Sequence, residues 1–262
     1  MVKVDQTLKE HILNNLAGIL ENRKNTTQFQ IDLLESYNEE EEVLKEKHYL
    51  RTSQLVGCMR KEYYRNLGYE QVMEPESFIT LSAGTFYHHL IQTVLAKELV
   101  SKEGLLTYQL DGVKISGHYD GVLALNGEKR ILEIKTTSPF AFSKLMKEIA
   151  DVEENYKKLS PNMTLFRYLL QANMYIKMLG DKDVNGGWIL IINKASVKGI
   201  PPLFSLKFDY DKRLPEIMIK KAQIIWKHFK EKKLPPPTKE KWECRYCGYV
   251  NCPLNARYKN EK

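Results

Sequence analysis

Long hydrophobic runs are missing from this 262-residue sequence, and cysteine is scarce, with four residues in the whole chain. No stretch approaches the roughly 18 consecutive apolar residues that a membrane-spanning helix needs. The first residues, MVKVDQTLKEHILNN, lack the apolar core of a secretory signal. A GxxxxGK[ST] phosphate-binding loop is missing as well, which excludes a nucleotide-driven motor of that class. We therefore expect a cytoplasmic protein with no membrane contact.

The chain does have a large share of hydrophobic residues and an excess of positive charge. Hydrophobic residues make up 43% of the sequence, enough for the core of one large domain or two small ones. A formal net charge of +7 and a pI near 9.0 favour a polyanionic partner such as nucleic acid. Solvated surface lysines would give the same pI, so charge alone leaves this partner open.

Two sections with different patterns follow one another along the chain. Residues 1–50 carry apolar positions at helical spacing and an acidic run, Glu39 to Glu42, which we interpret as a solvated helix face and not as a metal site. From residue 51 onward, helical segments alternate with strand-like segments. We therefore expect a helical N-terminal arm (1–50) followed by one α/β domain (51–262) with a small mixed sheet flanked by helices.

A tight hairpin turn is predicted at Asn126-Gly127, and it brings charged side chains from two strands together. Asp120 lies in GHYDG on the first strand, and Glu133 and Lys135 lie in ILEIKTT on the second. Because side chains alternate along a strand, Glu133 and Lys135 share one face and Ile134 points to the other. Two carboxylates on adjacent strands can hold Mg²⁺, and Lys135 could orient or help to deprotonate a water molecule. This set suits phosphodiester hydrolysis; the alternative is an ordinary exposed ion pair.

Two helical segments add polar and aromatic side chains. Gln171 and Tyr175 lie four residues apart on one helix face, where an amide and a phenol could reach a phosphate or a base. Packing of Tyr175 in the core is the alternative. A single helix predicted over residues 52–66, which includes Cys58, mixes cations with aromatic rings, and this mixture suits single-stranded nucleic acid. The residues expected to bind DNA are Arg60, Lys61, Tyr64 and Arg65.

The cysteines are unevenly distributed, with one near the start of the α/β section and three near the end of the chain. In a reducing compartment, clustered thiols favour metal ligation or redox chemistry over disulfides. Structural zinc and iron–sulfur clusters both normally take four protein ligands. A site with all four cysteines must therefore bring the two ends of the chain together. Iron–sulfur, zinc and unligated thiols all remain open at this point.

In this order, the motifs resemble those of the PD-(D/E)xK nucleases. Asp120 followed by Glu133-Ile134-Lys135 matches the nuclease core. His88, four residues after Gly84, matches the extra histidine of the RecB-like branch, although the neighbouring His89 competes for that place. Gln171 to Tyr175 matches the QxxxY element of that branch. One cysteine before the core and three after it, the last followed by proline, match its iron–sulfur subgroup, which includes CRISPR-adaptation exonucleases, the AddB nuclease domain and phage exonucleases.

The resemblance implies a restriction-endonuclease-like fold closed by a C-terminal iron–sulfur segment, and a metal-dependent exonuclease that prefers single-stranded DNA and cuts 5′ to 3′. The implied ligands of Mg²⁺ or Mn²⁺ are His88, Asp120, Glu133 and Ile134. The implied catalytic residues are Asp120, Glu133, Lys135, Gln171 and Tyr175. A 4Fe–4S cluster, favoured over zinc, would be held by Cys58, Cys244, Cys247 and Cys252. Helicase, recombination or CRISPR proteins would be partners, and the alternatives are a non-catalytic DNA-binding adaptor, an endonuclease or the nuclease subunit of a helicase complex.

Overall fold

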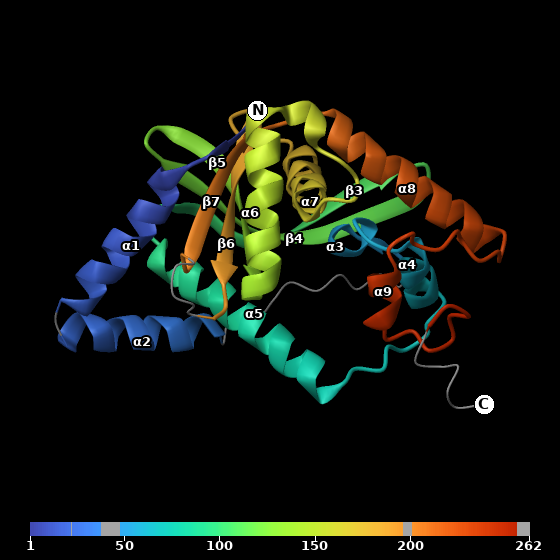
Figure 1. Ribbon diagram of the computed structural model, residues 1–262, viewed down its shortest axis with the longest axis horizontal. Helices are drawn as coiled ribbons and strands as arrows, with labels where there is room; N and C mark the ends of the chain where they lie inside the picture. Colours follow the sequence, from blue (N-terminus) through green and yellow to red (C-terminus); the bar gives the residue numbers. More distant parts are fainter. Residues whose placement is uncertain (22, 38–47, 196–200, 256–262) are drawn as a thin grey trace.

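The computed structural model describes residues 1–21, 23–37, 48–195 and 201–255, and a mixed β-sheet with helices on both faces forms its centre (Figure 1). The acidic run Glu39–Glu42 lies outside the described residues. The strands are, in chain order, β1 (Val2–Val4), β2 (Leu50–Arg51), β3 (Leu99–Leu110), β4 (Val113–Leu125), β5 (Glu128–Thr137), β6 (Gly186–Asn193) and β7 (Leu203–Asp209).

The helices differ in their relation to the sheet: α6 crosses in front of it in Figure 1, while α4 and α9 lie side by side at one end of the molecule. None of the helices in the described ranges is long and apolar enough to cross a membrane. The α-helices are α1 (Gln6–Leu20), α2 (Arg23–Tyr37), α3 (Thr52–Leu55), α4 (Met59–Asn66), α5 (Pro75–Val94), α6 (Pro139–Glu154), α7 (Thr164–Leu179), α8 (Arg213–Lys230) and α9 (Lys241–Arg245), with a 3₁₀ turn at Tyr156–Lys158.

Parallel and antiparallel pairs are mixed in the sheet, whose order is β1-β7-β6-β5-β4-β2, with β3 also paired to β4. β5 and β6 run parallel, whereas β4 and β5 form the antiparallel hairpin that the sequence predicts. Its turn residues Asn126 and Gly127 have φ values of +53° and +78°, and such positive φ values are typical of the tight turns that join two strands. The expectation of a mixed α/β sheet flanked by helices is confirmed.

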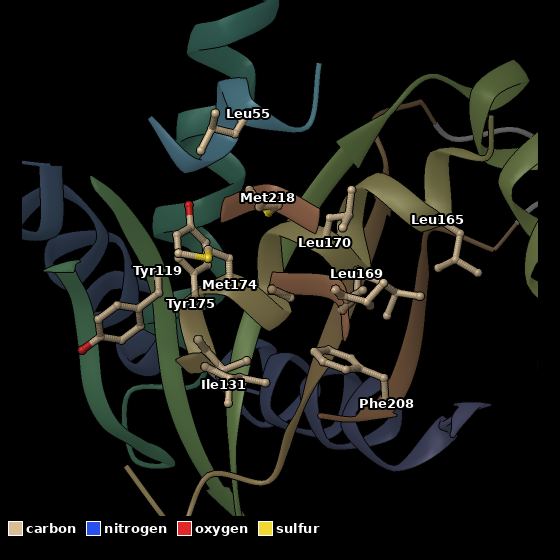
Figure 2. Packing of buried hydrophobic residues seen from close by; sticks show 14 of the residues in the cluster. Leu55, Tyr119, Ile131, Leu165, Leu169, Leu170, Met174, Tyr175, Phe208 and Met218 are labelled. Carbon is tan, nitrogen blue, oxygen red and sulfur yellow. The ribbon is translucent and has the colours of Figure 1, made fainter. Parts of the chain in front are cut away.

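Each face of the sheet has its own hydrophobic core. Ile131 of β5 packs on the face covered by α6, α7 and α8, in the same cluster as Leu169, Tyr175 and Met218, which we call the first core (Figure 2). The next residue, Leu132, packs on the opposite face with side chains of α1 and α5, in a cluster that we call the second core. Side chains alternate along β5, so Glu133 and Lys135 follow Ile131 onto the face of α7. Two charged groups therefore point into an otherwise apolar layer.

The N-terminal segment is built into the sheet, in contrast to the helical arm expected for residues 1–50. β1 pairs antiparallel with β7, and Leu8 and Ile12 of α1 are fully buried in the second core. Trp188 of β6 donates its indole N–H to Asp5 Oδ2 at 2.9 Å. These contacts join the first residues to strands that are almost 200 positions away in sequence. The domain boundary at residue 50 stays a prediction.

The helix expected over residues 52–66 is broken at Gly57 into α3 and α4. Cys58 is consequently the N-cap residue of α4 and does not lie within a helix, which corrects the sequence expectation. Lys221 of α8 donates its ammonium to the Gly57 carbonyl, so a tertiary contact holds the break. Gly68, with φ of +82°, follows the end of α4, as expected for a helix-terminating glycine.

Candidate active site

β4 and β5 separate at the point where the acidic residues lie. Their backbone pairing ends at Gly121 opposite Leu132, so Asp120 and Glu133 are the first residues beyond it. The N–H of Ile134 donates instead to Asp120 Oδ2 at 2.6 Å. The Asp120 carboxylate thus replaces the β4 main chain at the end of the ladder. Because the Ile134 side chain is buried in the second core, only the main chain of this residue belongs to the site.

Helix α5 supplies His88 and holds the main chain of Asp120. His88 Nδ1 lies 3.0 Å from Asp120 Oδ1. Gln92, one turn further along α5, donates its amide to the Asp120 carbonyl at 2.8 Å. Burial by itself lowers the pKa of His88, but the Asp120 carboxylate outweighs it and raises the pKa above its usual value. The structure therefore places His88 at Asp120, where the sequence expects a metal ligand.

Helix α7 covers Glu133 and Lys135 and ends a chain of hydrogen bonds. Lys135 Nζ forms an ion pair with Glu133 Oε1 and donates to Gln171 Oε1 at 3.1 Å. Gln171 Nε2 in turn donates to the Tyr175 hydroxyl at 3.0 Å. Tyr175 is 2% exposed and packs in the first core (Figure 2), so it cannot reach a substrate from this position. Tyr175 therefore does not make the expected contact with a phosphate or a base. Its hydroxyl instead accepts the hydrogen bond of Gln171.

Tyr168 belongs to this site, although the sequence pattern did not single it out. Lys135 Nζ lies 5.5 Å from the centroid of the Tyr168 ring, a cation–π distance. Tyr168, Gln171 and Tyr175 lie at positions i, i+3 and i+7 of α7 and so share one helix face. The tyrosine three residues before the glutamine was the signal available in the sequence. Burial raises the pKa of Tyr168, while the Lys135 ammonium opposes this shift.

Burial and the neighbouring charges together set the pKa values of Glu133 and Lys135. Burial raises the pKa of Glu133 to about 7; Lys135 opposes this shift, and the like charge of Asp120 adds to it. Burial alone would lower the pKa of Lys135, but the carboxylates of Glu133 and Asp120 outweigh it and raise that pKa. Lys135 is therefore an ammonium at neutral pH. In this state it can orient a water molecule and stabilise negative charge. Its help in deprotonating that water stays a prediction.

One oxygen of this site lacks a partner. Glu133 Oε2 is buried and accepts no hydrogen bond from any described residue. Such a group costs free energy unless a cation or a donor fills the place. Carboxylates from Asp120 and Glu133 with the imidazole of His88 form a donor set that Mg²⁺ or Mn²⁺ accepts. Within the described ranges, no three His, Cys, Asp or Glu side chains are already arranged to hold a metal ion; His88 and Asp120 contact each other, and Lys135 occupies Glu133 Oε1.

The four cysteines meet where α9 lies beside α4 (Figure 1). All four are free thiols, and together they line a cavity of about 20 Å³. Arg60 Nη1 lies 3.7 Å from Cys252 Sγ. Burial raises the pKa of Cys244 and of Cys247. The structure thus brings the two ends of the chain together. Ligation of a cluster or metal by Cys58, Cys244, Cys247 and Cys252 stays a prediction.

Helix α4, which we expected to bind DNA, is turned towards the protein. Tyr64 is 6% exposed, and its hydroxyl donates to the Asn251 carbonyl at 3.2 Å. Arg65 forms an ion pair of 3.0 Å with the buried Glu62. Arg60 donates to a main-chain carbonyl of the proline-rich segment at 2.8 Å. Tyr64 and Arg65 therefore hold the protein together, which corrects their expected role.

Lys61 also belonged to the expected DNA-binding set. It is half-buried and lines the cysteine cavity, as does Arg60. DNA binding by Arg60 and Lys61 stays a prediction.

A scan of protein-family models found no match to the chain, and a search of curated proteins found none either. Among solved structures, an alkaline exonuclease from Laribacter hongkongensis is 13% identical with a TM-score of 0.43, over 70% of this chain and 89% of that one. The structure of that exonuclease in complex with dAMP is 13% identical with a TM-score of 0.44, over 70% of this chain and 89% of that one. A protein from Eubacterium rectale named as a candidate exonuclease is 13% identical with a TM-score of 0.48, over 82% and 89%. Likenesses with TM-scores below 0.5 assign neither a family nor an activity to this chain.

Proposed function

We propose that this protein is a metal-dependent nuclease that hydrolyses phosphodiester bonds of single-stranded DNA from an end, in the 5′ to 3′ direction. The observation that carries the proposal is the meeting of Asp120, Glu133 and Lys135 where β4 and β5 separate, with Glu133 Oε2 buried and unpartnered among the described residues. The preference for single strands, the attack from an end and the direction rest on the resemblance of the motifs to those of RecB-like exonucleases.

The proposed Mg²⁺ or Mn²⁺ would be held by Asp120, Glu133 and His88, with the main-chain oxygen of Ile134 as a further ligand. When bound, the ion would supply Lewis-acid polarisation of the scissile phosphate. The divergence of β4 from β5 serves this arrangement, because it leaves room between the two carboxylates while the pairing of β4 with β3 and of β5 with β6 holds both strands in register. Gln92 adds to this rigidity through its hydrogen bond to the Asp120 carbonyl.

Lys135 is the residue that would act on the reacting groups. Its ammonium can orient the attacking water and stabilise the negative charge that develops on the phosphate. Gln171 fixes the ammonium by accepting its hydrogen bond, and Tyr175 fixes the amide of Gln171. Tyr168 covers the ammonium on another side. Gln171, Tyr175 and Tyr168 are therefore positioning residues in this proposal.

We further propose that the four cysteines bind a 4Fe–4S cluster, with zinc as the less favoured alternative. Thiolates are ligands that both groups accept. One remote cysteine followed by C-x₂-C-x₄-C-P is closer to the iron–sulfur pattern than to paired zinc knuckles. Cys58 follows the break between α3 and α4, whereas the other three lie within residues 244–252. A cluster would therefore tie the C-terminal segment to the rest of the protein and contribute to folding free energy.

The test is a nuclease assay on oligonucleotides labelled at the 5′ or the 3′ end, in single-stranded and double-stranded form, with and without Mn²⁺. We expect metal-dependent loss of the single strand, with the 5′ label released first. Glu154→Gln, at an exposed position of α6, is the matched control for Glu133→Gln, since both make the same chemical change. DNA binding by the wild type without cleavage under any metal would favour the adaptor, and cleavage of circular single strands would favour an endonuclease.

A further inference from the structure

The exposed face of α9 combines aromatic rings with positive charges. Trp242 and Tyr246 are 52% and 69% exposed. They lie one helical turn apart, since the Tyr246 N–H donates to the Trp242 carbonyl at 3.4 Å. Lys241 and Arg245 show the same four-residue spacing and are also exposed, and the exposed Lys239 precedes them. We call these five residues the α9 platform. Exposed aromatic groups gathered in this way are typical of contact surfaces.

The α9 platform has the residue chemistry that the sequence predicted for α4. Single-strand binding needs cations for the phosphates and accessible rings on which bases can stack. On α4, the Tyr64 ring is buried and the Arg65 guanidinium is paired with Glu62. On α9, both rings and both flanking cations face solvent. Accessible rings and cations, which α4 does not offer, are therefore present on α9, the helix that lies beside it (Figure 1).

One side of the platform adjoins α7, which carries part of the candidate active site. Arg167 Cζ lies 5.1 Å from the centroid of the Trp242 ring. The next residue of α7, Tyr168, is the one whose ring lies against Lys135. A base near Trp242 would thus be close to the helix that positions the Lys135 ammonium.

The other side of the platform opens into a cavity of about 480 Å³, between the first half of α5 and the C-terminal segment. Pockets of roughly 300–1,000 Å³ are the size that accepts small organic groups such as a base. Tyr246 and Leu81 both line it, and Leu81 precedes His88 by seven residues, about two turns of α5. The other apolar lining residues are Val72 and Met73, with Ser77 and Thr80 as hydroxyl donors and Glu76 as a carboxylate.

We propose that the α9 platform and this cavity bind the single strand next to the active site: the rings of Trp242 and Tyr246 stack on bases, and Lys241 and Arg245 contact phosphates. Charge complementarity selects this occupant, because the cations lie on the outer, solvent-facing side, whereas the cavity is lined by apolar side chains, neutral polar groups and one carboxylate. A strand with its bases inward and its phosphates outward matches that division. The inference rests on the proposed nuclease function for the identity of its ligand.

The test is equilibrium binding, without Mg²⁺ or Mn²⁺, of two fluorescent strands of about 15 nucleotides, near the upper end of common single-strand site sizes. One strand is oligo-dT, and the other is abasic with the same charge. Tyr246→Leu should weaken dT binding about tenfold, the order expected for one lost stacking contact, and leave abasic binding unchanged. Tyr246→Phe keeps the ring and should bind both strands like the wild type.

A charge variant separates the phosphates from the bases. Lys241→Ala combined with Arg245→Ala should weaken both strands and reduce the slope of log K against log salt by about 1.4, since each phosphate contact on a single strand adds about 0.7. Lys220→Ala combined with Lys227→Ala, at exposed positions of α8, removes the same charge and is the matched control. An equal change of slope in the control would overturn the proposal, because binding would then follow net charge alone.

The two proposals fail separately. If the wild type cleaves DNA while Tyr246→Leu binds dT as tightly as the wild type, the platform is refuted and the nuclease stands. If no cleavage occurs but dT binding depends on the Tyr246 ring, the nuclease is refuted and the platform stands. Self-association in sedimentation that Tyr246→Leu abolishes, together with unchanged dT binding, would assign this face to a second copy of the chain and overturn the proposal.

Discussion

Four glutamates are buried in the described part of the chain, and the surroundings of two of them, Glu62 and Glu133, differ. Glu62 of α4 is fully buried, and both of its oxygens accept hydrogen bonds: from the Arg51 N–H at 2.7 Å and from the Arg51 and Arg65 side chains at 3.0 to 3.3 Å. Glu133 of β5 is 2% exposed; Lys135 occupies one oxygen, and the other is unpartnered in the described part of the chain. The described fold supplies hydrogen-bond donors to both oxygens of Glu62, whereas Glu133 Oε2 still lacks a donor or a cation.

We propose that this difference separates a structural carboxylate from a functional one, because Glu133, unlike Glu62, also lies beside a second carboxylate, that of Asp120. Satisfied buried charges hold elements together, and loss of one partner leaves the other charge uncompensated. An unsatisfied buried carboxylate lowers stability, and proteins retain such groups at sites where activity requires them. Glu62 ties α4 to the segment before it, and Glu133 faces the candidate metal site. The same substitution, Glu→Gln, made at each of the two positions tests this distinction.

The largest expected effect is that of Glu133→Gln on activity. Removal of this charge should lower kcat by on the order of 10³, because the proposed metal loses a ligand and Lys135 loses its ion pair. The melting temperature should change little, since the substitution removes the repulsion between Glu133 and Asp120 together with the ion pair to Lys135. Activity and thermal unfolding are measured on the same preparation, with Glu154→Gln as control. Near wild-type activity in Glu133→Gln would refute the site.

Glu62→Gln should have the opposite profile. The amide cannot satisfy both arginines, so the free energy of unfolding should fall by about 3–5 kcal/mol, as for other broken buried ion pairs. Specific activity well below the unfolding temperature should be retained, since Glu62 lies outside the candidate active site. Chemical denaturation measures the stability change. A large loss of activity without a loss of stability would remove the distinction between the two glutamates.

The proposed iron–sulfur cluster should depend on Cys58, the residue that directly precedes α4. Anaerobically purified protein should be brown and carry about four irons per chain, and Cys58→Ala should lose the iron as completely as Cys247→Ala. Loss of one ligand frees the C-terminal segment, so both variants should become more sensitive to protease. Glu133→Gln should keep its iron. Full iron content in Cys58→Ala would exclude Cys58 as a ligand, and one zinc in a colourless protein would replace the iron–sulfur proposal.

The smallest effect should come from a residue that acts through Lys135. Gln171→Leu keeps the side-chain volume near that of glutamine but removes the acceptor of the Lys135 ammonium, and should lower kcat about 10- to 100-fold with little change in KM. Lys177→Gln on the same helix is the control, because Lys177 pairs with Glu216 away from the candidate site. An unchanged kcat in Gln171→Leu would show that Lys135 does not need this anchor.

Local patterns predicted that Asp120, Glu133 and Lys135 lie close together, because a single hairpin carries all three. Asn126-Gly127 defines a hairpin, and the alternation of side chains along β5 then places Glu133 and Lys135 on one face near Asp120. No long-range information was needed for this step. Tyr168 could have been found by the same reasoning, from its helical spacing to Gln171.

The accessibility of α4 and the place of β1 could not be predicted in this way. A helix with cations and aromatic rings is a DNA-binding surface only if nothing covers it, and α4 is covered by residues almost 190 positions later, as the Tyr64 contact with Asn251 shows. Three residues, Val2–Val4, likewise become a strand because β7 presents an edge to them. Both outcomes depend on contacts between distant parts of the chain.

The measurement that tests the central claim most directly is a calorimetric titration of the protein with Mn²⁺ between pH 5.5 and 8. The pKa of Glu133 is raised to about 7 and that of His88 is also raised, and a metal binds their deprotonated forms. Binding should therefore release protons below about pH 7, and the apparent affinity should rise with pH and level off above it. Glu133→Gln should lose most of the affinity, and Glu62→Gln should not. Equal Mn²⁺ affinity in the wild type and Glu133→Gln, at every pH, would contradict the account.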